Sequence, residues 1–318
     1  MRLKKINGLS LVGTQTVLNK QHIKPIIAVN ASWIALSPFG FVPALNSPKV
    51  HYSVDGQWWG ETIEGLRVIN SLAREQGLKV MLKPQLWVKN GAFTGFIRME
   101  NEQDYVQFEK EYQSFIIGFA RLAEELDVPL FCMGTELQNF VADRPEFWSA
   151  LIVAIKKVYH GKITYAANWD AYVNIPFWEE IDYIGVDAYF PLSDAKTPEV
   201  HSLEEAWKPH KEKLLAMAIL KEKPILFTEF GYRSVAYTAK EPWAGGAGLK
   251  EVDLLGQAHA LTAIFNVFWK EDWFAGGFLW KWFPEHAQSG GLEDKGYTPQ
   301  QKPSEILLQE FYKNQTLK

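Results

Sequence analysis

The chain has 318 residues, of which 47% are hydrophobic and 22% charged, enough apolar material for a large core. Its net charge is −4 with both signs interspersed, which argues against a nucleic-acid partner. A single cysteine, Cys132, excludes an internal disulfide, and the seven histidines show no spacing typical of a metal site. No apolar run approaches the ~20 residues that span a bilayer, so we expect no membrane segment.

The first residues, from Met1 to Lys5, are basic and precede an apolar run, as in a signal peptide. That run holds about eight residues and is interrupted by Asn7 and Ser10, at the lower limit of the ~7–15 residues of a signal sequence. We therefore predict a first strand here. Localisation stays open: cytoplasmic if the chain is complete, secreted or surface-attached if a leader was removed.

Apolar runs bounded by Gly, Pro, Asn or Asp predict eight strands, separated in most cases by helical patterns. In chain order the predicted strands are residues 6–13, 26–36, 79–86, 129–134, 163–169, 181–189, 224–232 and 274–282. The predicted helices are 61–75, 103–126, 145–159, a short segment near 176, 203–220, 252–269 and 304–312. Strands that alternate with helices indicate a parallel sheet, and eight repeats favour a (β/α)8 TIM barrel. We expect one α/β domain over residues 1–318.

In such barrels the functional residues lie at the carboxyl ends of the strands. The side chains that the pattern places there are Trp33, Ser37, Lys83, Gln85, Trp87, Glu136, Asn168, Trp169, Asp187, Tyr189, Glu229, Trp280, Lys281 and Trp282. Alternation along a strand puts Lys83, Gln85 and Trp87 on one face, and Asp187 with Tyr189 on another. Two glutamates, Glu136 and Glu229, follow the fourth and seventh strands.

Several of these residues also have a structural interpretation. Glu229 ends an apolar strand, and Arg233, four residues further on, is a candidate ion-pair partner. Lys83 and Gln85 are equally compatible with a polar layer inside the barrel, and Trp87 with packing at its rim. Trp280, Trp282 and Phe278 share one alternation and cannot all face a ligand; we favour a binding role for Trp280. The adjacent Trp58 and Trp59 suit loop anchors, and the loop around Gly245 and Gly246 is either a lid or flexible surface.

Two carboxyl groups across a barrel mouth are what glycoside hydrolysis requires. One protonates the leaving oxygen, and the other acts at the anomeric carbon. A shared site also separates their pKa values, so that one stays protonated while the other is ionised. The many aromatic residues, 13 Trp, 12 Tyr and 20 Phe, suit the apolar faces of sugars.

The chain resembles clan A of the retaining glycoside hydrolases, and within it family 113, whose members degrade β-mannan. The matching stretches are residues 30–33, 37–39, 59–62 (Trp-Gly-Glu-Thr), 80–87 (Val-Met-Leu-Lys-Pro-Gln-Leu-Trp), 134–137 (Gly-Thr-Glu-Leu), 228–234 (Thr-Glu-Phe-Gly-Tyr-Arg-Ser), 242–243, 257–258 and 276–280 (Gly-Gly-Phe-Leu-Trp). They occur in order over nearly the whole chain.

The resemblance implies that Glu136 is the general acid/base, Glu229 the nucleophile and Trp280 the platform under the sugar at the cleavage point. It also implies that Tyr189 hydrogen-bonds the nucleophile. Thr135 departs from the clan, which usually has Asn before its acid/base to contact the sugar 2-hydroxyl. Thr can replace only part of that contact.

We therefore expect a retaining β-glycosidase acting on β-1,4-mannan or manno-oligosaccharides, with no metal or organic cofactor. Trp280, Tyr189, Trp87, Lys83, Gln85, Asn168 and Asp187 are the predicted substrate-binding residues. The expected partner is an oligo- or polysaccharide, with neither nucleic acid nor membrane, and the chain is expected to be a monomer or weak homo-oligomer. The alternatives are the same chemistry on a β-glucan or gluco-oligosaccharide, a carbohydrate-binding barrel without turnover, and a lyase that uses Lys83 as a Schiff base. Endo or exo attack stays open.

Overall fold

The computed structural model describes residues 4–244 and 251–316. The loop around Gly245 and Gly246, interpreted from the sequence as either a lid or flexible surface, lies outside the described residues. No helix in the described part is long and apolar enough to cross a membrane.

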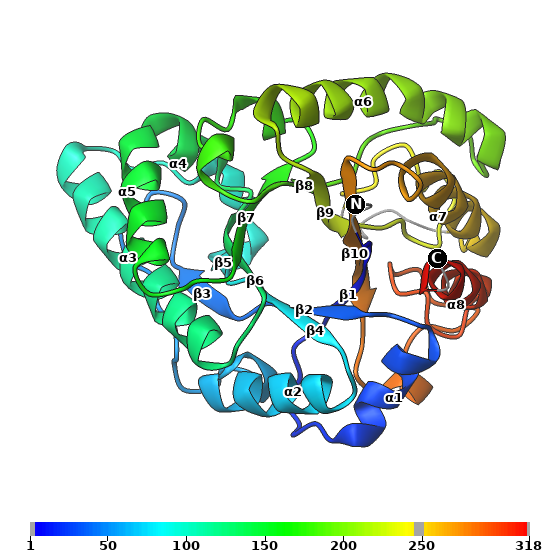
Figure 1. The fold of residues 1–318 in the computed structure, drawn as a ribbon, viewed down its shortest axis with the longest axis horizontal. Helices are drawn as coiled ribbons and strands as arrows, with labels where there is room; N and C mark the ends of the chain where they lie inside the picture. Colours follow the sequence, from blue (N-terminus) through cyan, green and yellow to red (C-terminus); the bar gives the residue numbers. More distant parts are fainter. Residues whose placement is uncertain (1–3, 245–250, 317–318) are drawn as a thin grey trace.

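Eight parallel strands close into a barrel, in the spatial order β1-β10-β9-β8-β7-β6-β4-β2 (Figure 1). They are β1 (Ile6–Leu11), β2 (Trp33–Leu36), β4 (Lys79–Leu82), β6 (Leu130–Thr135), β7 (Lys162–Asn168), β8 (Tyr183–Asp187), β9 (Ile225–Phe230) and β10 (Phe274–Trp282). The first and last strands pair with each other and complete the ring. The predicted (β/α)8 barrel is confirmed.

Helices surround the barrel and cover its outer face (Figure 1). They are α1 (Lys20–Ala28), α2 (Ile63–Glu75), α3 (Glu102–Glu125), α4 (Gln138–Asp143), α5 (Pro145–Lys156), α6 (Val200–Lys221), α7 (Leu254–Phe268) and α8 (Pro303–Thr316). The longest, α3 and α6, carry apolar side chains at three-and-four spacing toward the strands. In α3, for example, Asn101 caps the first turn by accepting the N–H of Asp104, while Phe108 and Phe115 are buried.

Two predicted strands were wrong in extent. The run 26–36 begins inside α1, whose buried face includes Ile26, and only Trp33–Leu36 is strand. Between them Asn30 takes the left-handed conformation, with φ of 59°, that turns the chain. The run 79–86 is divided at Pro84, so that β5 (Gln85–Val88) leaves the barrel and pairs with β3 (Phe39–Val42) in a separate two-stranded sheet.

The barrel interior is filled by a small apolar cluster distinct from the larger core between strands and helices. It consists of Ile6, Ala35, Met81, Leu130, Cys132, Ala166, Leu226, Ala275 and Phe278. Gly8 leaves room for the ring of Phe278, because a Cβ at this position would overlap that ring. Trp33, predicted at the mouth, instead starts β2 and packs edge-on against Phe278, with ring centroids 6.3 Å apart. It therefore belongs to the amino-terminal end of the barrel.

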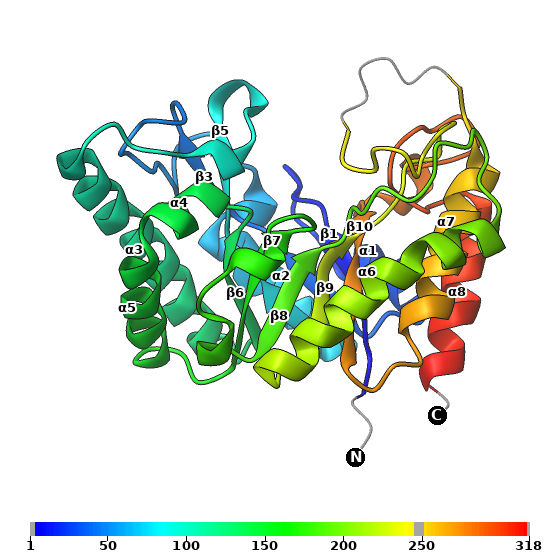
Figure 2. The ribbon, with the colours of Figure 1, turned by 90° about the horizontal axis from the view of Figure 1, so that it is seen from above.

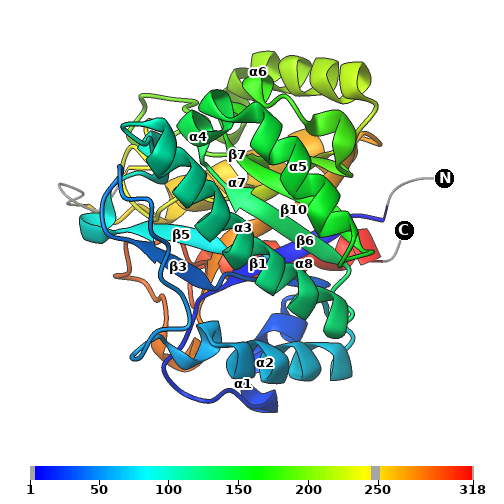
Figure 3. The same cartoon turned by 90° about the vertical axis from the view of Figure 1, so that its left-hand side faces the viewer.

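The sheet β3–β5 rises above the carboxyl ends of the barrel strands, on the face opposite the start of β1 and the end of α8 (Figures 2 and 3). Its parallel pairing matches Phe39 with Gln85 and Phe41 with Trp87. This sheet makes one wall of the barrel mouth deeper than a bare ring of strands would be.

Candidate active site

Glu229 lies near the end of β9 and is only 7% exposed. Three side chains donate hydrogen bonds to its carboxylate. The Lys83 ammonium donates to Oε1, and the Gln85 amide donates to the same oxygen at 3.2 Å. The Tyr189 hydroxyl donates to Oε2 at 2.8 Å. A buried carboxylate needs such partners, because without them burial costs several kcal/mol. The hydrogen bond that the sequence predicted from Tyr189 is present.

Lys83 connects Glu229 to a second buried carboxyl group, that of Asp187. The Lys83 ammonium lies 3.4 Å from Asp187 Oδ1, which also accepts a hydrogen bond of 2.7 Å from the Thr228 hydroxyl. Burial, followed by the negative charge of Glu229, raises the pKa of Asp187 to about 7. Lys83 and Gln85 therefore form a polar layer that fixes the Glu229 carboxylate by hydrogen bonds to Oε1.

Lys83 is a cation in this setting. Burial alone lowers the pKa of its ammonium, but the charges of Asp187 and Glu229 outweigh burial and raise the pKa above its ordinary value. A protonated, ion-paired amine is not a nucleophile. The site therefore does not favour a Schiff-base lyase.

Glu136 follows β6 directly, and the backbone on both sides of it is fixed. Its N–H donates to the carbonyl of Ala166 at 2.8 Å, and the N–H of Leu137 donates to the Tyr165 hydroxyl, also at 2.8 Å. Glu136 has a φ of 53°, a left-handed conformation that costs a non-glycine residue ~1 kcal/mol or more. Such strained positions concentrate at functional sites, where the surrounding structure imposes them.

The electrostatic surroundings of Glu136 favour its protonated form. Burial of the carboxyl group, followed by the negative charges of Asp187 and Glu229, raises its pKa well above the ordinary value. The side chain as a whole remains partly exposed to solvent, so a ligand at the mouth can reach it. Glu136 and Glu229 thus lie in different surroundings: burial and negative charge favour the proton on Glu136, whereas Glu229 is ion-paired to Lys83.

The predicted pairing of Arg233 with Glu229 is wrong, because Lys83 occupies that position. The Arg233 guanidinium lies over the ring of Tyr297, 4.5 Å from its centroid. Tyr297 in turn packs edge-on against Tyr189, with centroids 6.0 Å apart. Tyr189 is therefore held between its hydrogen bond to Glu229 and this aromatic neighbour.

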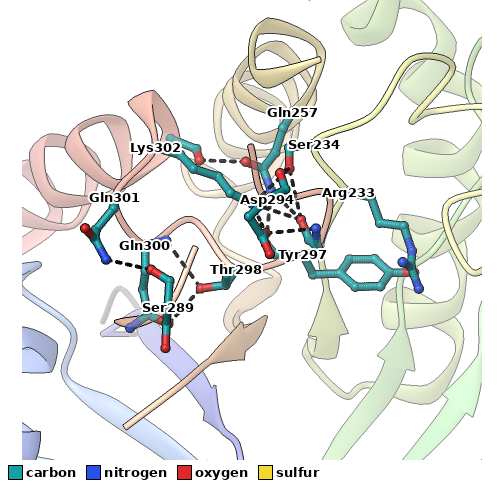
Figure 4. A network of polar contacts seen from close by, with 12 residues as sticks. Arg233, Ser234, Gln257, Ser289, Asp294, Tyr297, Thr298, Gln300, Gln301 and Lys302 are labelled. Atoms are coloured by element: carbon teal, nitrogen blue, oxygen red, sulfur yellow. Dashed lines mark hydrogen bonds and ion pairs between the residues drawn. The ribbon is translucent and has the colours of Figure 1, made fainter. Parts of the chain in front are cut away.

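A buried polar network anchors the segment between β10 and α8 that carries Tyr297 (Figure 4). The Lys302 ammonium donates to Ser234 Oγ at 2.8 Å and to Asp294 Oδ1 at 2.6 Å. The Gln257 amide donates to the carbonyls of Tyr232 and Tyr297, at 2.9 and 3.0 Å. The network therefore ties this segment to the backbone just beyond Glu229.

The remaining predicted residues have different positions. Trp280 is half-buried at the mouth, whereas Phe278 fills the barrel interior and Trp282 is fully buried in the outer core. Trp87 is 51% exposed and packs edge-on against Phe39. Asn168 pairs with Asp187 in the register of β7 and β8, and its side-chain oxygen accepts the N–H of Trp169 at 3.0 Å.

Sequence reasoning did not single out Tyr297, Ser10 or Glu61 as site residues. Glu61 and Ser10 both line a cavity next to Trp280. Glu61 could have been noticed in the sequence, because it lies in the matching stretch 59–62. It is a carboxylate close to two tryptophans and at the start of a predicted helix. No group of three His, Cys, Asp or Glu in the described ranges is arranged to hold a metal ion.

A parallel (β/α)8 barrel with two carboxyl groups in different electrostatic surroundings at its mouth is the arrangement used by glycoside hydrolases. The model of Glycoside Hydrolase Family 113 matches residues 14–302 of this chain. The chain belongs to Glycoside Hydrolase Family 113 and is a glycoside hydrolase. No curated protein matches it significantly.

Solved structures of the same fold cover nearly the whole chain. A family 113 β-mannanase from Alicyclobacillus acidocaldarius, in complex with ManMIm, is 24% identical with a TM-score of 0.86, over 98% of each chain. A second family 113 β-1,4-mannanase is 20% identical with a TM-score of 0.83, over 98% of this chain and 99% of that one. A β-glucuronidase from Ruminococcus gnavus is 14% identical with a TM-score of 0.65, over 98% of this chain and 50% of that one.

Proposed function

We propose that this glycoside hydrolase cleaves β-1,4-mannan or manno-oligosaccharides with retention of configuration, through a covalent glycosyl–enzyme intermediate. The observation that supports the mechanism is the unequal state of its two glutamates. Burial and neighbouring negative charge favour the proton on Glu136, while Glu229 is ion-paired to Lys83. The substrate class is supported by family membership and by the β-mannanases of the same fold.

In the first step Glu136 donates its proton to the glycosidic oxygen, and the bond from that oxygen to the anomeric carbon breaks. One oxygen of Glu229 forms a bond to the anomeric carbon from the opposite face. In the second step Glu136, now ionised, takes a proton from water, whose oxygen attacks the same carbon and releases Glu229. The two inversions restore the starting configuration.

The neighbours of Glu229 position it for attack. Lys83 and Gln85 donate to Oε1, whereas Oε2 accepts the single hydrogen bond from Tyr189. These donors fix the carboxylate in one orientation before substrate arrives, which lowers the entropic cost of the attack. Trp280, half-buried near the end of β10, supplies an aromatic face for the sugar ring.

Azide rescue tests the two roles. Glu229→Ala is expected to lose ~10⁴-fold or more in kcat on mannohexaose while still binding it, and azide is expected to give the α-glycosyl azide. Glu136→Ala is expected to lose ~10²–10⁴-fold on the same substrate, to retain its first step on an aryl glycoside with a good leaving group, and to give the β-glycosyl azide. Glu125→Ala, on the outer face of α3, serves as the control.

Exchanged azide products would reverse the two assignments, and undiminished turnover by Glu229→Ala would overturn the mechanism. Products from mannohexaose beside cellohexaose report the sugar choice and the endo or exo mode together. Preference for cellohexaose would replace mannan by a β-glucan substrate. Binding of either oligosaccharide without turnover by the unaltered chain would favour a carbohydrate-binding barrel.

A further inference from the structure

Asp187, which the sequence suggested as a substrate-binding residue, is a fully buried carboxyl group at the end of β8. Because it is 0% exposed, a ligand at the barrel mouth does not reach it. It pairs with Glu229 in the register of β8 and β9. Burying a carboxyl group is costly, and the reaction proposed above gives this one no task. Asp187 therefore needs a role other than contact with the substrate.

The two oxygens of Asp187 are used unequally. Oδ1 lies 3.4 Å from the Lys83 ammonium and accepts a hydrogen bond of 2.7 Å from the Thr228 hydroxyl. Oδ2 is buried and has no hydrogen-bond partner among the described residues. The amide oxygen of an asparagine would accept the same two hydrogen bonds. The property that distinguishes the aspartate at this position is therefore its charge.

Lys83 stands between this charge and the charge of Glu229. Its side chain is 1% exposed, and its ammonium contacts both Asp187 Oδ1 and Glu229 Oε1. A single negative charge is enough to neutralise one buried cation. The second acid is under strain in the free enzyme, because burial and then the charge of Glu229 raise the pKa of Asp187 to about 7. The site thus holds one more acid than its cation requires.

The proposed reaction removes one of these negative charges for part of each cycle. When an oxygen of Glu229 bonds to the anomeric carbon and the leaving group departs with the bonding electrons, the carboxylate becomes a neutral ester. Lys83 then stays buried without the charge of Glu229, and an uncompensated buried cation is strongly unfavourable. The ester also removes one cause of the raised pKa of Asp187, so that the ionised form is favoured at this stage.

We propose that Asp187 is a positioning residue that acts through Lys83, as the counter-ion of the Lys83 ammonium while Glu229 is esterified. The Asp187 carboxylate keeps the ammonium charged and in place, so that it still faces Glu229 Oε1 when hydrolysis of the ester restores the carboxylate. The inference rests on the proposed function in that the reaction passes through a covalent glycosyl–enzyme intermediate.

Trapping with 2-deoxy-2-fluoro-β-mannosyl fluoride separates the two steps. Loss of activity measures formation of the intermediate, and recovery after removal of the reagent measures its breakdown. Fluoride leaves without a proton from Glu136, so the effect of Asp187 on the pKa of Glu136 does not enter the rate of formation.

At pH 8, Asp187→Asn is expected to form the intermediate ~10–100-fold more slowly, because Lys83 is left without a counter-ion in the product of that step. Breakdown should be at least as fast as in the unaltered enzyme, since it restores the charge of Glu229. A general loosening of the site would instead slow both steps.

The Lys83→Met background shows whether Asp187 acts through Lys83. Without a cation to neutralise, adding Asp187→Asn is expected to change the rate of formation by less than ~3-fold. This comparison also decides the question if Asp187→Asn alone does not fold. Asp182→Asn is the matched control, the same change next to the amino end of β8, at a partly exposed carboxylate paired with Lys162. It should leave both rates within ~2-fold.

Unchanged formation in Asp187→Asn, or equal slowing with and without Lys83, would overturn the counter-ion role while leaving the proposed function intact. If the manno-configured fluoride labels no residue of the unaltered enzyme, the gluco-configured reagent takes its place in the same comparison. Absence of a covalent label from both reagents would overturn the intermediate, and with it both proposals.

Discussion

Lys83 faces two carboxyl groups, those of Asp187 and Glu229, from a position that is only 1% exposed. A buried cation between two acids is costly to remove from one side only, because the remaining charges are left without compensation. The single ammonium thereby sets both the orientation of Glu229 and the charge balance under the whole site.

Lys83→Met should make stability strongly dependent on pH. Asp187 has a folded-state pKa of about 7, above the ~3.9 of an unfolded chain. Its contribution to stability is therefore present below about pH 4 and is lost as the pH rises toward 7. Without the Lys83 cation this loss grows, so we expect the variant to lose ~3–5 kcal/mol of unfolding free energy at pH 8 and less at pH 5.

Urea denaturation at the two pH values measures the effect of Lys83→Met. Lys208→Met, at an exposed position paired with Glu205, is the control and should unfold like the unaltered chain. A loss of stability that is equal at pH 5 and pH 8 would contradict the charge-balance account.

Glu136 should govern the alkaline limb of the rate profile. Its pKa is raised well above the ordinary value by burial and then by the negative charges of Asp187 and Glu229, so the acid form persists to higher pH than in an ordinary glutamate. The first step needs that proton, and kcat/KM is therefore expected to fall as the pH rises through the pKa of Glu136. With an aryl glycoside that leaves readily, Glu136→Ala should lose this limb. An unchanged alkaline limb in the variant would assign the proton to another group.

At the level of elements, the end of β6 holds Glu136 through close packing at Gly134. A Cβ on Gly134 would stand 2.7 Å from the Tyr112 hydroxyl, 2.9 Å from Tyr165 and 3.1 Å from Trp148. The strand can pass so close to α3 and α5 only without a side chain at this position. Tyr165 is also the residue that binds the N–H of Leu137, so packing and hydrogen bonding act at the same point.

Gly134→Ala is expected to cost ~1–3 kcal/mol of stability, because well-packed neighbours have to shift. It should also lower kcat, since the displaced backbone carries Glu136 two residues further on. Gly118→Ala on α3 is the matched control: a Cβ there meets no atom within 4 Å, and the change should raise helix stability by ~0.5–1 kcal/mol with activity unchanged. Thermal unfolding and kcat together check the pair. Full activity in Gly134→Ala would show that the close packing does not position Glu136.

Sequence periodicity predicted the order of the eight barrel strands and of most helices between them, but it missed α1, α4 and the β3–β5 sheet and misplaced some limits. The run 26–36 is apolar except for Asn30 and Ser32, and these two polar residues between α1 and β2 were read as part of one strand. The turn at Asn30 that separates them depends on backbone conformation. In the run 79–86 the sequence did contain a sign that the strand is interrupted. Pro84, which lies between β4 and β5, cannot donate a backbone hydrogen bond within a sheet.

The two glutamates were predictable because each stands at the carboxyl end of a barrel strand, whereas their partners depend on contacts between distant segments. Arg233 was the partner suggested by sequence proximity, yet Lys83, 146 residues from Glu229, forms the ion pair. The cavity at Glu61 needed the β3–β5 sheet as a wall, and that sheet arises from a pairing that alternation alone does not specify. The substrate roles assigned to the site residues stay predictions.

At the level of the whole molecule, α8 packs the carboxyl-terminal segment against the barrel. Tyr312 is fully buried and donates a hydrogen bond of 3.0 Å to the carbonyl of Gly8 in β1, while Phe311 stacks on Phe265 of α7. The interface thus connects the last helix with both the first strand and the preceding helix.

Tyr312→Ala should lower the unfolding free energy by ~3–5 kcal/mol, through the lost aromatic volume and the cavity left behind. The denaturant midpoint is expected to fall with an unchanged slope, because the surface exposed on unfolding stays nearly the same. Ile306→Ala on the same helix, at a side chain that is 62% exposed, should leave the midpoint in place. Equal midpoints for the two variants would mean that α8 contributes little to the fold.

We also expect the described barrel to act as a monomer or weak homo-oligomer, which light scattering across protein concentrations would check. The single domain over residues 1–318 likewise stays a prediction. Limited proteolysis that released a stable fragment much shorter than the barrel would contradict it.

The pairing of β1 with β10 has a consequence for how the protein is made. Lys5, just before β1, is bonded to the carbonyl of Phe274 across 269 residues. The ribosome adds ~5–20 residues per second, so β10 is synthesised tens of seconds after β1. Until β10 emerges the ring is open, its parallel edges are unpaired and the apolar barrel interior lacks Phe278, which is a state prone to aggregation. Trp280 lies in that last strand, so the site is completed only at the moment the ring closes. We therefore expect the last strand to be required for a closed barrel and for the complete site.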